Sequence, residues 1–251
     1  MAQLKTLVAL FVILSAVQVS FGERSFNLTE PKARYFDLPQ CCANSQDRHS
    51  GIQIIQPQPG FGEPFGVFCD QDYEGGGWTV IQNRYDGSVN FYRGWQQYEN
   101  GFGSMEGEFW LGLKKIHELT FSKRYELVVL LDDWEGNRAV ARYSRFLVAG
   151  PEEKYTLKSV GTYTGTAGDS LSGHVGMKFS TLDVDNDTYE DGACAVQYQG
   201  AWWYSACHSS NLNGAYMRGT VPAFALMMCW KSFKGYYYGL KTSRMMIRAV
   251  K

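Results

Sequence analysis

Residues 183–214 constrain the fold more than any other part of the chain. Three acids stand at alternate positions before a short loop that two cysteines could close: Asp183, Asp185, Asp187, Cys194 and Cys207. A dense aromatic run, Trp202-Trp203-Tyr204, leads into the second cysteine and His208. The acids are typical of a site for a hard cation, and the loop is typical of a stapled recognition surface. The segment contains no pattern of a catalytic centre, and we predict no catalytic residues and no enzyme activity.

The N-terminus has the pattern of a secretory signal peptide over residues 1–22. Lys5 gives a positive start, residues 7–19 are mostly apolar, and small residues stand at the −3 and −1 positions of a cleavage site. The apolar run is shorter than the ~20 residues that a membrane span needs, which leaves a signal anchor as the weaker alternative. We therefore expect a secreted, extracellular chain that starts near Glu23 and has no membrane span.

The composition favours a strand-rich and loop-rich domain. The chain has 27 Gly, 7 Trp and 16 Tyr, a combination more typical of sheets and turns than of a helical bundle. Its formal net charge of −1 gives no reason to expect nucleic acid as a partner. The sequence has no heptad array and no Gly-x-y repeat, so it contains no coiled-coil or collagen stalk.

Six cysteines in a secreted chain predict disulfide bonds. Six cysteines allow fifteen pairings, so the sequence alone leaves the connectivity open. A bond between Cys194 and Cys207 would close a short loop and contribute about 3 kcal/mol in the chain-entropy model. A zinc site is the alternative, but the chain has no C-x-x-C pair. The cysteines are Cys41, Cys42, Cys69, Cys194, Cys207 and Cys229.

Two sequons occur in the chain. Asn27-Leu28-Thr29 lies in a polar stretch, and we predict that Asn27 is glycosylated. The sequon at Asn186 lies inside the acidic segment, where a bound cation would hide it, and we do not predict its use.

The order of apolar patterns predicts an α+β fold with an antiparallel sheet in the middle and a long-looped C-terminal third. Helical spacing predicts a helix over residues 109–119, on which Phe109, Leu113, Ile116 and Leu119 share one face. Strand-like runs occur at residues 52–55, 65–68, 78–81, 125–131, 139–148 and 244–250.

A series of motifs, in order, resembles the fibrinogen C-terminal-like domain. The resemblance runs from about Cys42 to the last residues, and it implies a domain at 41–251 preceded by a short polar segment at 23–40. It is closest to the lectin branch, which includes ficolins, tachylectins and invertebrate fibrinogen-related proteins, and is weaker toward fibrin-polymerising chains and angiopoietins. The motifs are Phe68-Cys69-Asp70, Gly75 to Gln82, Asp86 to Phe91, Gly101-Phe102-Gly103, Gly107 to Gly112, Phe179-Ser180-Thr181, Trp202-Trp203, Ser210 to Gly214 and Met245 to Arg248.

The resemblance implies a small N-terminal subregion, a central antiparallel sheet and a loop-rich subregion for calcium and ligand. It implies disulfides Cys42–Cys69 and Cys194–Cys207. Cys41 and Cys229 fall outside the family pattern. Cys41 is a candidate for a bridge to a second chain in a homo-oligomer, and pairing with Cys229 or a free thiol stay open.

The resemblance also implies a Ca²⁺ site in the acidic segment. Asp185 and Asp187 would supply carboxylates, backbone carbonyls would come from Tyr189 and from Asp191 or Gly192, and Asp183 would be a supporting acid. The segment is not an EF-hand, because its sixth residue is Thr188 and its twelfth is Cys194. The alternative is a solvated acidic turn. The chain carries one residue more between Asp187 and Cys194 than many relatives do.

In the lectin branch an acetamide binds beside this loop, with its methyl group among aromatic rings and its carbonyl at a cis peptide. Carried over by position, the pocket consists of Tyr198, the Ala206-Cys207 peptide, His208, Phe224 and Tyr236. Each residue also has an ordinary structural alternative. His208 alone would be a hydrogen-bonded structural histidine, residues 236–238 would be a strand, and Trp202 and Trp203 are more typical of the core.

Two departures from the family concern the pocket. The run Ala225-Leu226-Met227-Met228-Cys229 replaces polar, flexible residues, and we expect it to reshape the pocket wall. Tyr198 stands where fibrin-polymerising chains carry an aspartate.

The sequence thus predicts a secreted, calcium-dependent lectin that binds N-acetylated glycans on microbial surfaces in innate immunity. Such a lectin needs several sites on one assembly for useful avidity. The alternative is a protein-binding module, related to signalling or haemostasis, that has lost sugar binding. An enzyme is disfavoured, because neither G-x-S-x-G nor H-E-x-x-H occurs and the adjacent Asp132 and Asp133 diverge in direction.

Overall fold

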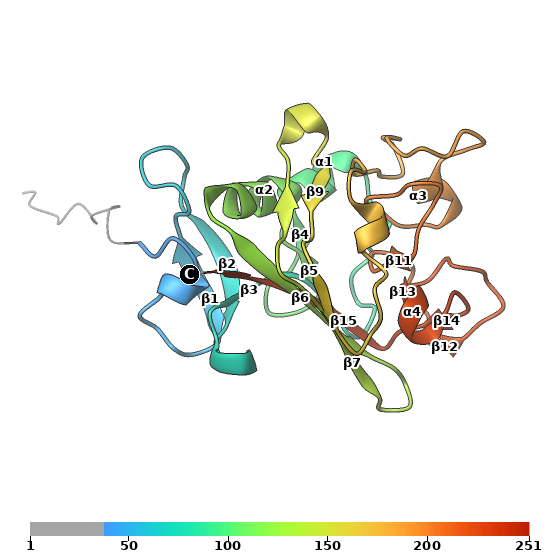
Figure 1. The fold of residues 1–251 in the computed structure, drawn as a ribbon, viewed down its shortest axis with the longest axis horizontal. Helices are drawn as coiled ribbons and strands as arrows, with labels where there is room; N and C mark the ends of the chain where they lie inside the picture. The colour runs from blue at the N-terminus through green and yellow to red at the C-terminus, as the bar shows by residue number, and fades with distance from the viewer. Residues whose placement is uncertain (1–37, 251) are drawn as a thin grey trace, which may run out of the picture. The chain divides into compact units, whose positions relative to one another are not determined.

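A nine-stranded antiparallel sheet organises residues 38–250, the part of the chain that this computed structural model describes (Figure 1). The predicted signal peptide and Asn27 lie outside the described residues, and so does most of the 23–40 segment. Two short strands, β4 (Phe102–Gly103) and β5 (Phe109–Trp110), extend the sheet from β3. The main strands lie in the order β1 (Gly51–Ile55), β2 (Phe65–Asp70), β3 (Trp78–Arg84), β15 (Thr242–Ala249), β6 (Tyr125–Asp132), β7 (Arg138–Tyr143) and β10 (Tyr163–Gly165).

The last strand of the chain is the middle of the sheet. β15 lies between β3 and β6, and Met246 is opposite Val80 on one side and Val128 on the other. Met245, Met246 and Ile247 are fully buried. Burial on this scale is the dominant stabilising term in folding, so the closing segment anchors the core. The predicted α+β architecture with a central antiparallel sheet is confirmed.

The predicted helix begins later than the sequence pattern indicated. α2 spans Leu113–Ser122 and buries Leu113, Ile116 and Leu119, as predicted. Phe109 belongs instead to β5, so its assignment to the helix was wrong. Gly112 separates the two elements with a φ of 108°, a left-handed conformation that favours glycine and cannot continue a helix from residue 109. α2 packs beside α1 (Trp95–Asn100) and β8 (Leu147–Val148).

The single strand predicted at 139–148 is two strands. β7 ends at Tyr143, and β8 (Leu147–Val148) pairs with β9 (Leu157–Ser159). Between them the chain changes partners. Ser144 N–H donates to the Thr162 carbonyl, whereas Phe146 N–H donates to the Tyr125 carbonyl. Apolar alternation continues through this exchange, so the sequence pattern could not reveal it.

Between residues 180 and 241 the structure consists mainly of loops, on the right of Figure 1. Short 3₁₀ turns occur at Cys42–Asn44, Tyr73–Gly75, Pro151–Glu153 and Ser172–His174. Regular structure in the loop-rich part is limited to α3 (Cys194–Gln197), α4 (Lys231–Lys234), the pair β11 (Ser210–Asn211) and β13 (Cys229–Trp230), and the pair β12 (Gly219–Thr220) and β14 (Tyr238–Gly239). No helix among the described residues is long and apolar enough to cross a membrane.

Both disulfides that the resemblance implied are present. Cys42–Cys69 and Cys194–Cys207 have Cα–Cα distances of 5.4 and 5.6 Å. Cys41 and Cys229 are free and buried, so they do not pair with each other. The Cys41 side chain is 1% exposed and its Sγ donates to Asn44 Oδ1, so it presents no thiol to a second chain in this structure.

Candidate functional site

The loop-rich region is tied to the sheet through the Asn211–Gly214 turn. From β3, Gln82 Nε2 donates to the Leu212 carbonyl at 2.9 Å, and Arg84 Nη1 donates to the carbonyls of Leu212 and Gly214. Within the turn, Asn213 Nδ2 donates to the Ala201 carbonyl. The Ser210 to Gly214 motif is thus where the loop-rich region contacts the sheet. The contact consists of side-chain hydrogen bonds and not of a hydrogen-bonded ladder between strands.

His174 fixes the aromatic run from behind. Its ring accepts at Nε2 from Ser209 N–H, which leaves the Nδ1 proton to donate to the Trp203 carbonyl at 2.7 Å. Burial lowers the pKa of His174 to about 4, partly offset by the Trp203 hydrogen bond, so the ring is neutral at physiological pH. His174 was not among the predicted site residues, because an isolated histidine carries no local sequence pattern.

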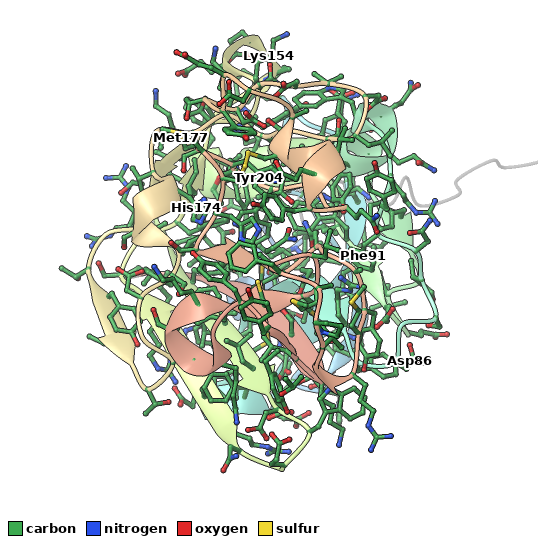
Figure 2. The ribbon with its side chains drawn as sticks, turned by 90° about the vertical axis from the view of Figure 1, so that its right-hand side faces the viewer. Asp86, Phe91, Lys154, His174, Met177 and Tyr204 are labelled. Atoms are coloured by element: carbon green, nitrogen blue, oxygen red, sulfur yellow. A yellow bond between two sulfur atoms is a disulfide. The ribbon has the colours of Figure 1, made fainter. Side chains whose placement is uncertain are left out.

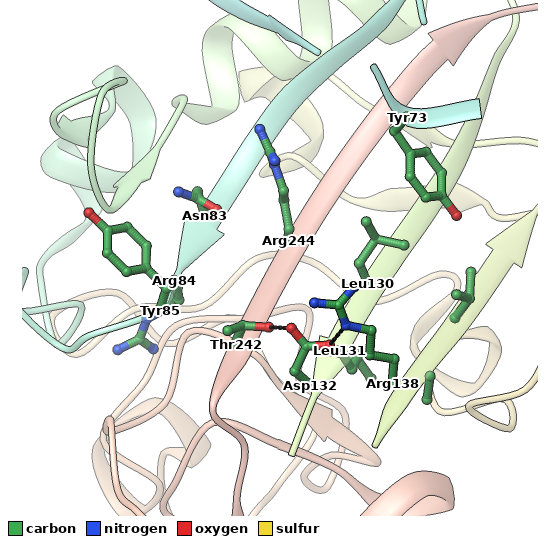
Figure 3. Close-up of a pocket in the computed structure, with 12 residues that line it drawn as sticks. Tyr73, Asn83, Arg84, Tyr85, Leu130, Leu131, Asp132, Arg138, Thr242 and Arg244 are labelled. Atoms are coloured by element: carbon green, nitrogen blue, oxygen red, sulfur yellow. Dashed lines mark hydrogen bonds and ion pairs between the residues drawn. The ribbon is translucent and has the colours of Figure 1, made fainter. Parts of the chain in front are cut away.

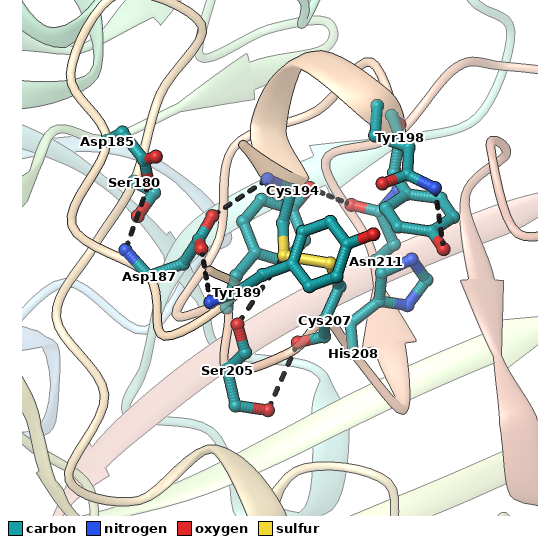
Figure 4. The surroundings of a disulfide bond; sticks show 12 residues. Ser180, Asp185, Asp187, Tyr189, Cys194, Tyr198, Ser205, Cys207, His208 and Asn211 are labelled. Carbon is teal, nitrogen blue, oxygen red and sulfur yellow. Dashed lines mark hydrogen bonds between the residues drawn. A yellow bond between two sulfur atoms is a disulfide. The ribbon is translucent and has the colours of Figure 1, made fainter. Parts of the chain in front are cut away.

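Of the three alternating acids, Asp187 contacts the disulfide loop, and Asp185 lies next to Asp187 on the side away from it (Figure 4). Asp187 accepts from Tyr189 N–H at 2.9 Å and from Cys194 N–H at 2.8 Å, and Asp185 accepts from Asp187 N–H at 3.1 Å. Burial raises the pKa of Asp187, the two N–H donors oppose this, and the nearby Asp185 raises it further. Two carboxylates held this close repel each other in the absence of a cation.

Asp183 is placed differently. Its carboxylate accepts from Trp95 N–H at 2.8 Å, at the start of α1, and from Thr181 Oγ1 at 2.7 Å. These contacts tie the acidic loop to α1 and give Asp183 a structural partner that the sequence did not reveal.

The donors around Asp185 and Asp187 fit a calcium ion. Within the described residues, the carbonyls of Tyr189, Asp191 and Gly192 accept no hydrogen bond from the protein, so they are available beside the two carboxylates. Hard oxygen donors of this kind are those that Ca²⁺ prefers. No cluster of three or more His, Cys, Asp or Glu side chains suited to a metal occurs in residues 38–250, so a site here depends on backbone oxygens.

The predicted pocket residues come together as one aromatic cluster. The ring centroids of Tyr198 and His208 are 4.7 Å apart, those of His208 and Tyr236 are 6.0 Å apart, and those of Tyr236 and Phe224 are 5.0 Å apart. Tyr236 Oη donates to the His208 carbonyl at 3.0 Å. Phe224 is 47% exposed and forms the outer part of the cluster, which we call the aromatic cluster below.

His208 lies inside this cluster with both ring nitrogens buried and without a hydrogen-bond partner. Burial lowers the pKa of His208 to about 3, with a further contribution from His174 and a partial offset from the backbone of Ala225. An unpaired buried polar group is rare in native proteins because it costs free energy. The ring therefore offers hydrogen-bonding capacity that the chain itself does not use.

The cluster and the acidic loop are joined through the disulfide loop. The Ala206–Cys207 peptide is cis, as the resemblance implied. Ser205 N–H donates to the Cys207 carbonyl at 2.7 Å, and the Ser205 carbonyl accepts from Thr188 N–H at 3.2 Å. Thr188 follows Asp187 directly, so two hydrogen bonds connect the acidic loop to the residues of the cis peptide.

The apolar run at 225–229 does not form the pocket wall that we expected. Met227, Met228 and Cys229 are fully buried, and Met228 N–H donates to the Ala215 carbonyl. Their side chains fill the interior beneath β11 and β13, and only Leu226 retains partial exposure. The bulky substitutions are therefore absorbed by the core.

The asparagine of the second sequon, Asn186, is hydrogen-bonded within the protein. Asn186 is half-buried, and its Nδ2 donates to the Phe179 carbonyl at 2.8 Å. The side-chain nitrogen that a glycan would modify is therefore engaged within the protein.

A separate pocket of about 570 Å³ lies on the open face of the sheet (Figure 3). Two of its charged side chains pair with each other. Arg138 Nε is 3.2 Å from Asp132 Oδ1, and Thr242 Oγ1 donates to the same carboxylate. None of the predicted site residues lines this pocket.

Sequence and structure comparisons place the chain among known proteins. Residues 39–250 match the family described as fibrinogen beta and gamma chains, C-terminal globular domain. Fibrinogen C domain-containing protein 1 of Xenopus tropicalis is 52% identical over 226 residues, which cover 84% of this chain and 49% of the relative. Microfibril-associated glycoprotein 4 of Homo sapiens is 47% identical over 203 residues, which cover 79% of each. The fibrinogen-like globe domain of human ANGPTL6 superposes with a TM-score of 0.80 at 43% identity, covering 85% of this chain and 96% of that domain.

The fold and the match over most of its length define a fibrinogen-like globular domain. The chain belongs to the fibrinogen C-terminal domain family. It spans about half the length of the Fibrinogen C domain-containing protein 1 relatives that it matches.

Proposed function

We propose that this chain is a secreted recognition protein that binds N-acetylated glycans, such as those of microbial surfaces, in a calcium-dependent manner as part of innate immunity. The observation that carries the proposal is the buried His208 ring, whose two nitrogens lack partners inside a cluster of tyrosine and phenylalanine rings. An acetamide is half apolar and brings one donor and one acceptor. Its methyl group suits the rings, and its polar atoms suit the unpaired nitrogens and the cis peptide.

The proposed activity is equilibrium binding without a chemical step. Tyr198, Phe224 and Tyr236 exclude water from the methyl group, and Tyr236 holds the His208 backbone in place. Bound calcium would supply positive charge between Asp185 and Asp187 and so fix the loop that carries the cis peptide. Asp183 would support that loop through its hydrogen bond to α1 and would not bind the ion.

A single acetamide buries little area, so each site binds a monosaccharide weakly. Useful avidity then requires an assembly with several sites. Because Cys41 is buried, we propose that such an assembly forms by contacts other than a Cys41 disulfide.

The test is retention of the disulfide-intact protein on immobilised N-acetylglucosamine in calcium. We expect elution by EDTA and by free N-acetylglucosamine, and no elution by glucose, which lacks the acetamide. Phe224→Ala should abolish retention, whereas Phe121→Ala, which removes a still more exposed ring on α2 (68% against 47%), should not. Calcium-independent retention, or equal elution by glucose, would refute the acetamide mechanism.

The alternative is a protein-binding module, and one relative favours keeping it. The lamprey fibrin D-dimer, 35% identical to this chain, was solved with the peptide ligand Gly-His-Arg-Pro-amide. The sequence argument for lost sugar binding is weaker, because the side chains of Met227, Met228 and Cys229 are fully buried. Capture by that peptide, with no retention on N-acetylglucosamine, would favour the alternative.

A further inference from the structure

The pocket of about 570 Å³ on the open face of the sheet (Figure 3) has no role in the function proposed above. All of its lining residues lie outside the loop-rich region between residues 180 and 241. Figure 2 looks onto that loop-rich region, and none of the residues labelled there lines the pocket. The volume of the pocket is within the range of sites that hold a small molecule.

A row of apolar side chains lines the pocket. The strand register places Leu130 of β6 between Val140 of β7 and Arg244 of β15. Leu130 and Val140, which we call the apolar floor below, are both half-buried and both line the pocket. The burial of such surface away from water is favourable, so the apolar floor favours a ligand with an apolar body.

The next row on the same face of the sheet is covered by the chain itself. The register places Met246 beside Val128, and both are fully buried. Two residues further along the strands, the Arg248 guanidinium lies 4.2 Å from the Trp78 ring centroid, and the rings of Trp78 and Tyr73 are 5.9 Å apart. The apolar floor has no comparable cover within residues 38–250, and the pocket lies in its place.

The charged side chains that line the pocket are mostly basic. Figure 3 shows Leu130 between Arg244 and Arg138, and Asp132 is the only acid among the described residues that line the pocket. Asp132 is already paired with Arg138. Arg84 also lines the pocket, but its Nη1 is bonded to carbonyls of the loop-rich region. The lining therefore favours an anion over a cation.

Arg244 has donors that the chain does not use. Its Nη1 lies 3.2 Å from Asp70 Oδ2, and its Nε has no hydrogen-bond partner within the described residues. The side chain is 31% exposed. A guanidinium group carries five N–H donors in a fork that matches a carboxylate. The Asp70 contact thus holds Arg244 in place and leaves hydrogen-bonding capacity for a second anion.

We propose that this pocket binds an aliphatic carboxylate, such as a medium-chain fatty acid, with its carboxylate on Arg244 and its hydrocarbon chain on the apolar floor. This binding goes beyond the proposed function and does not depend on it, because no residue of the aromatic cluster or of the acidic segment lines the pocket.

The test is calorimetry of the disulfide-intact protein with octanoate, and octanol is the neutral counterpart. Octanoate should bind with a Kd below about 1 mM, as a ligand of this size allows. Octanol should bind about ten-fold more weakly, because it cannot form the charge-assisted hydrogen bonds to Arg244. Saturation with N-acetylglucosamine and removal of calcium with EDTA should leave the octanoate affinity unchanged.

Two variants locate the ligand. Arg244→Gln should lower the octanoate affinity about ten-fold, to that of octanol. Val140→Glu, which places a like charge on the apolar floor, should abolish octanoate binding. Arg145→Gln, which changes an exposed arginine outside the pocket, is the matched control and should keep the full affinity. Thermal unfolding shows whether each variant is folded, and the two variants act independently of each other.

The proposal is overturned if octanoate does not bind, if octanol binds equally well, or if the octanoate affinity survives Arg244→Gln or Val140→Glu. Displacement of octanoate by N-acetylglucosamine would also overturn it, because the carboxylate would then occupy the aromatic cluster. Retention on immobilised N-acetylglucosamine is a separate measurement, so the failure of one proposal is distinguishable from the failure of the other.

Discussion

The central sheet and the loop-rich region between residues 180 and 241 are stabilised in different ways. In the sheet, β15 is hydrogen-bonded along its length to β3 and β6 and buries a continuous apolar row. In the loop-rich region single contacts substitute for ladders, such as His174 with Trp203 and Arg84 with Gly214. Many interactions hold each strand of the sheet, so the loss of one should alter the sheet little. Each loop contact, in contrast, positions a specific part of the candidate site.

Removing each disulfide in turn should have the largest effect on the free energy of unfolding and should separate the two regions. Replacing Cys42 and Cys69 by serine opens a separation of 27 residues and should lower the free energy of unfolding by about 3.5 kcal/mol, whereas replacing Cys194 and Cys207 opens 13 and should cost about 3 kcal/mol. We expect the folded fraction of the first variant to retain sugar binding and that of the second to lose it. Urea unfolding and bead retention measure the two quantities. Equal effects on binding would remove the distinction between the regions.

A pH titration probes the loop anchors next. His174 has a pKa near 6.5 when unfolded and about 4 when folded, so the unfolded chain binds more protons between these values. Stability should therefore fall as the pH drops from about 6.5 to about 4, by on the order of 3 kcal/mol from this residue. His174→Gln should remove the contribution of His174 from this slope in thermal unfolding and leave that of His208, whose pKa is also lowered by burial. An unchanged slope in the variant would show that other groups control it.

Calcium removal should destabilise the loop-rich region and leave the central sheet unchanged. If calcium is present at 100 times its Kd, its loss lowers stability by about 2.7 kcal/mol, or roughly 5–10 °C in Tm for a domain of this size. Asp185→Asn/Asp187→Asn should abolish the effect of EDTA on Tm. Asp183→Asn, whose carboxylate contacts Trp95, is the control and should keep it. If Asp183→Asn instead removed the effect of EDTA on Tm, Asp183 would be a ligand of the ion.

The smallest effect concerns one hydroxyl group in the aromatic cluster. Tyr236→Phe removes the donor to the His208 carbonyl, worth about 1 kcal/mol, and should weaken N-acetylglucosamine binding about five-fold. Tyr237→Phe alters the exposed neighbour, whose hydroxyl has no partner within the described residues, and should leave affinity unchanged. Calorimetry compares the two. Equal losses would mean that Tyr236 acts only through its ring.

Local patterns predicted most of the sheet, because strands such as β3 and β6 bury continuous apolar runs. They failed where a partner decides the structure, as at Phe109 and at Ser144, whose neighbours come from elsewhere in the chain. The aromatic cluster was predicted by resemblance. Arg84 and His174 were not, because each acts across 29 or more residues on backbone groups that leave no trace in a sequence pattern.

The most direct test is the ¹⁵N NMR signal of the His208 ring during titration with N-acetylglucosamine in calcium. The account predicts a ring that is neutral at pH 7 in the free protein, with a ¹⁵N shift that changes on saturation as a nitrogen gains a partner. The change should be absent in EDTA. A His208 signal that does not respond to the sugar, while the sugar binds, would contradict the assignment of the site.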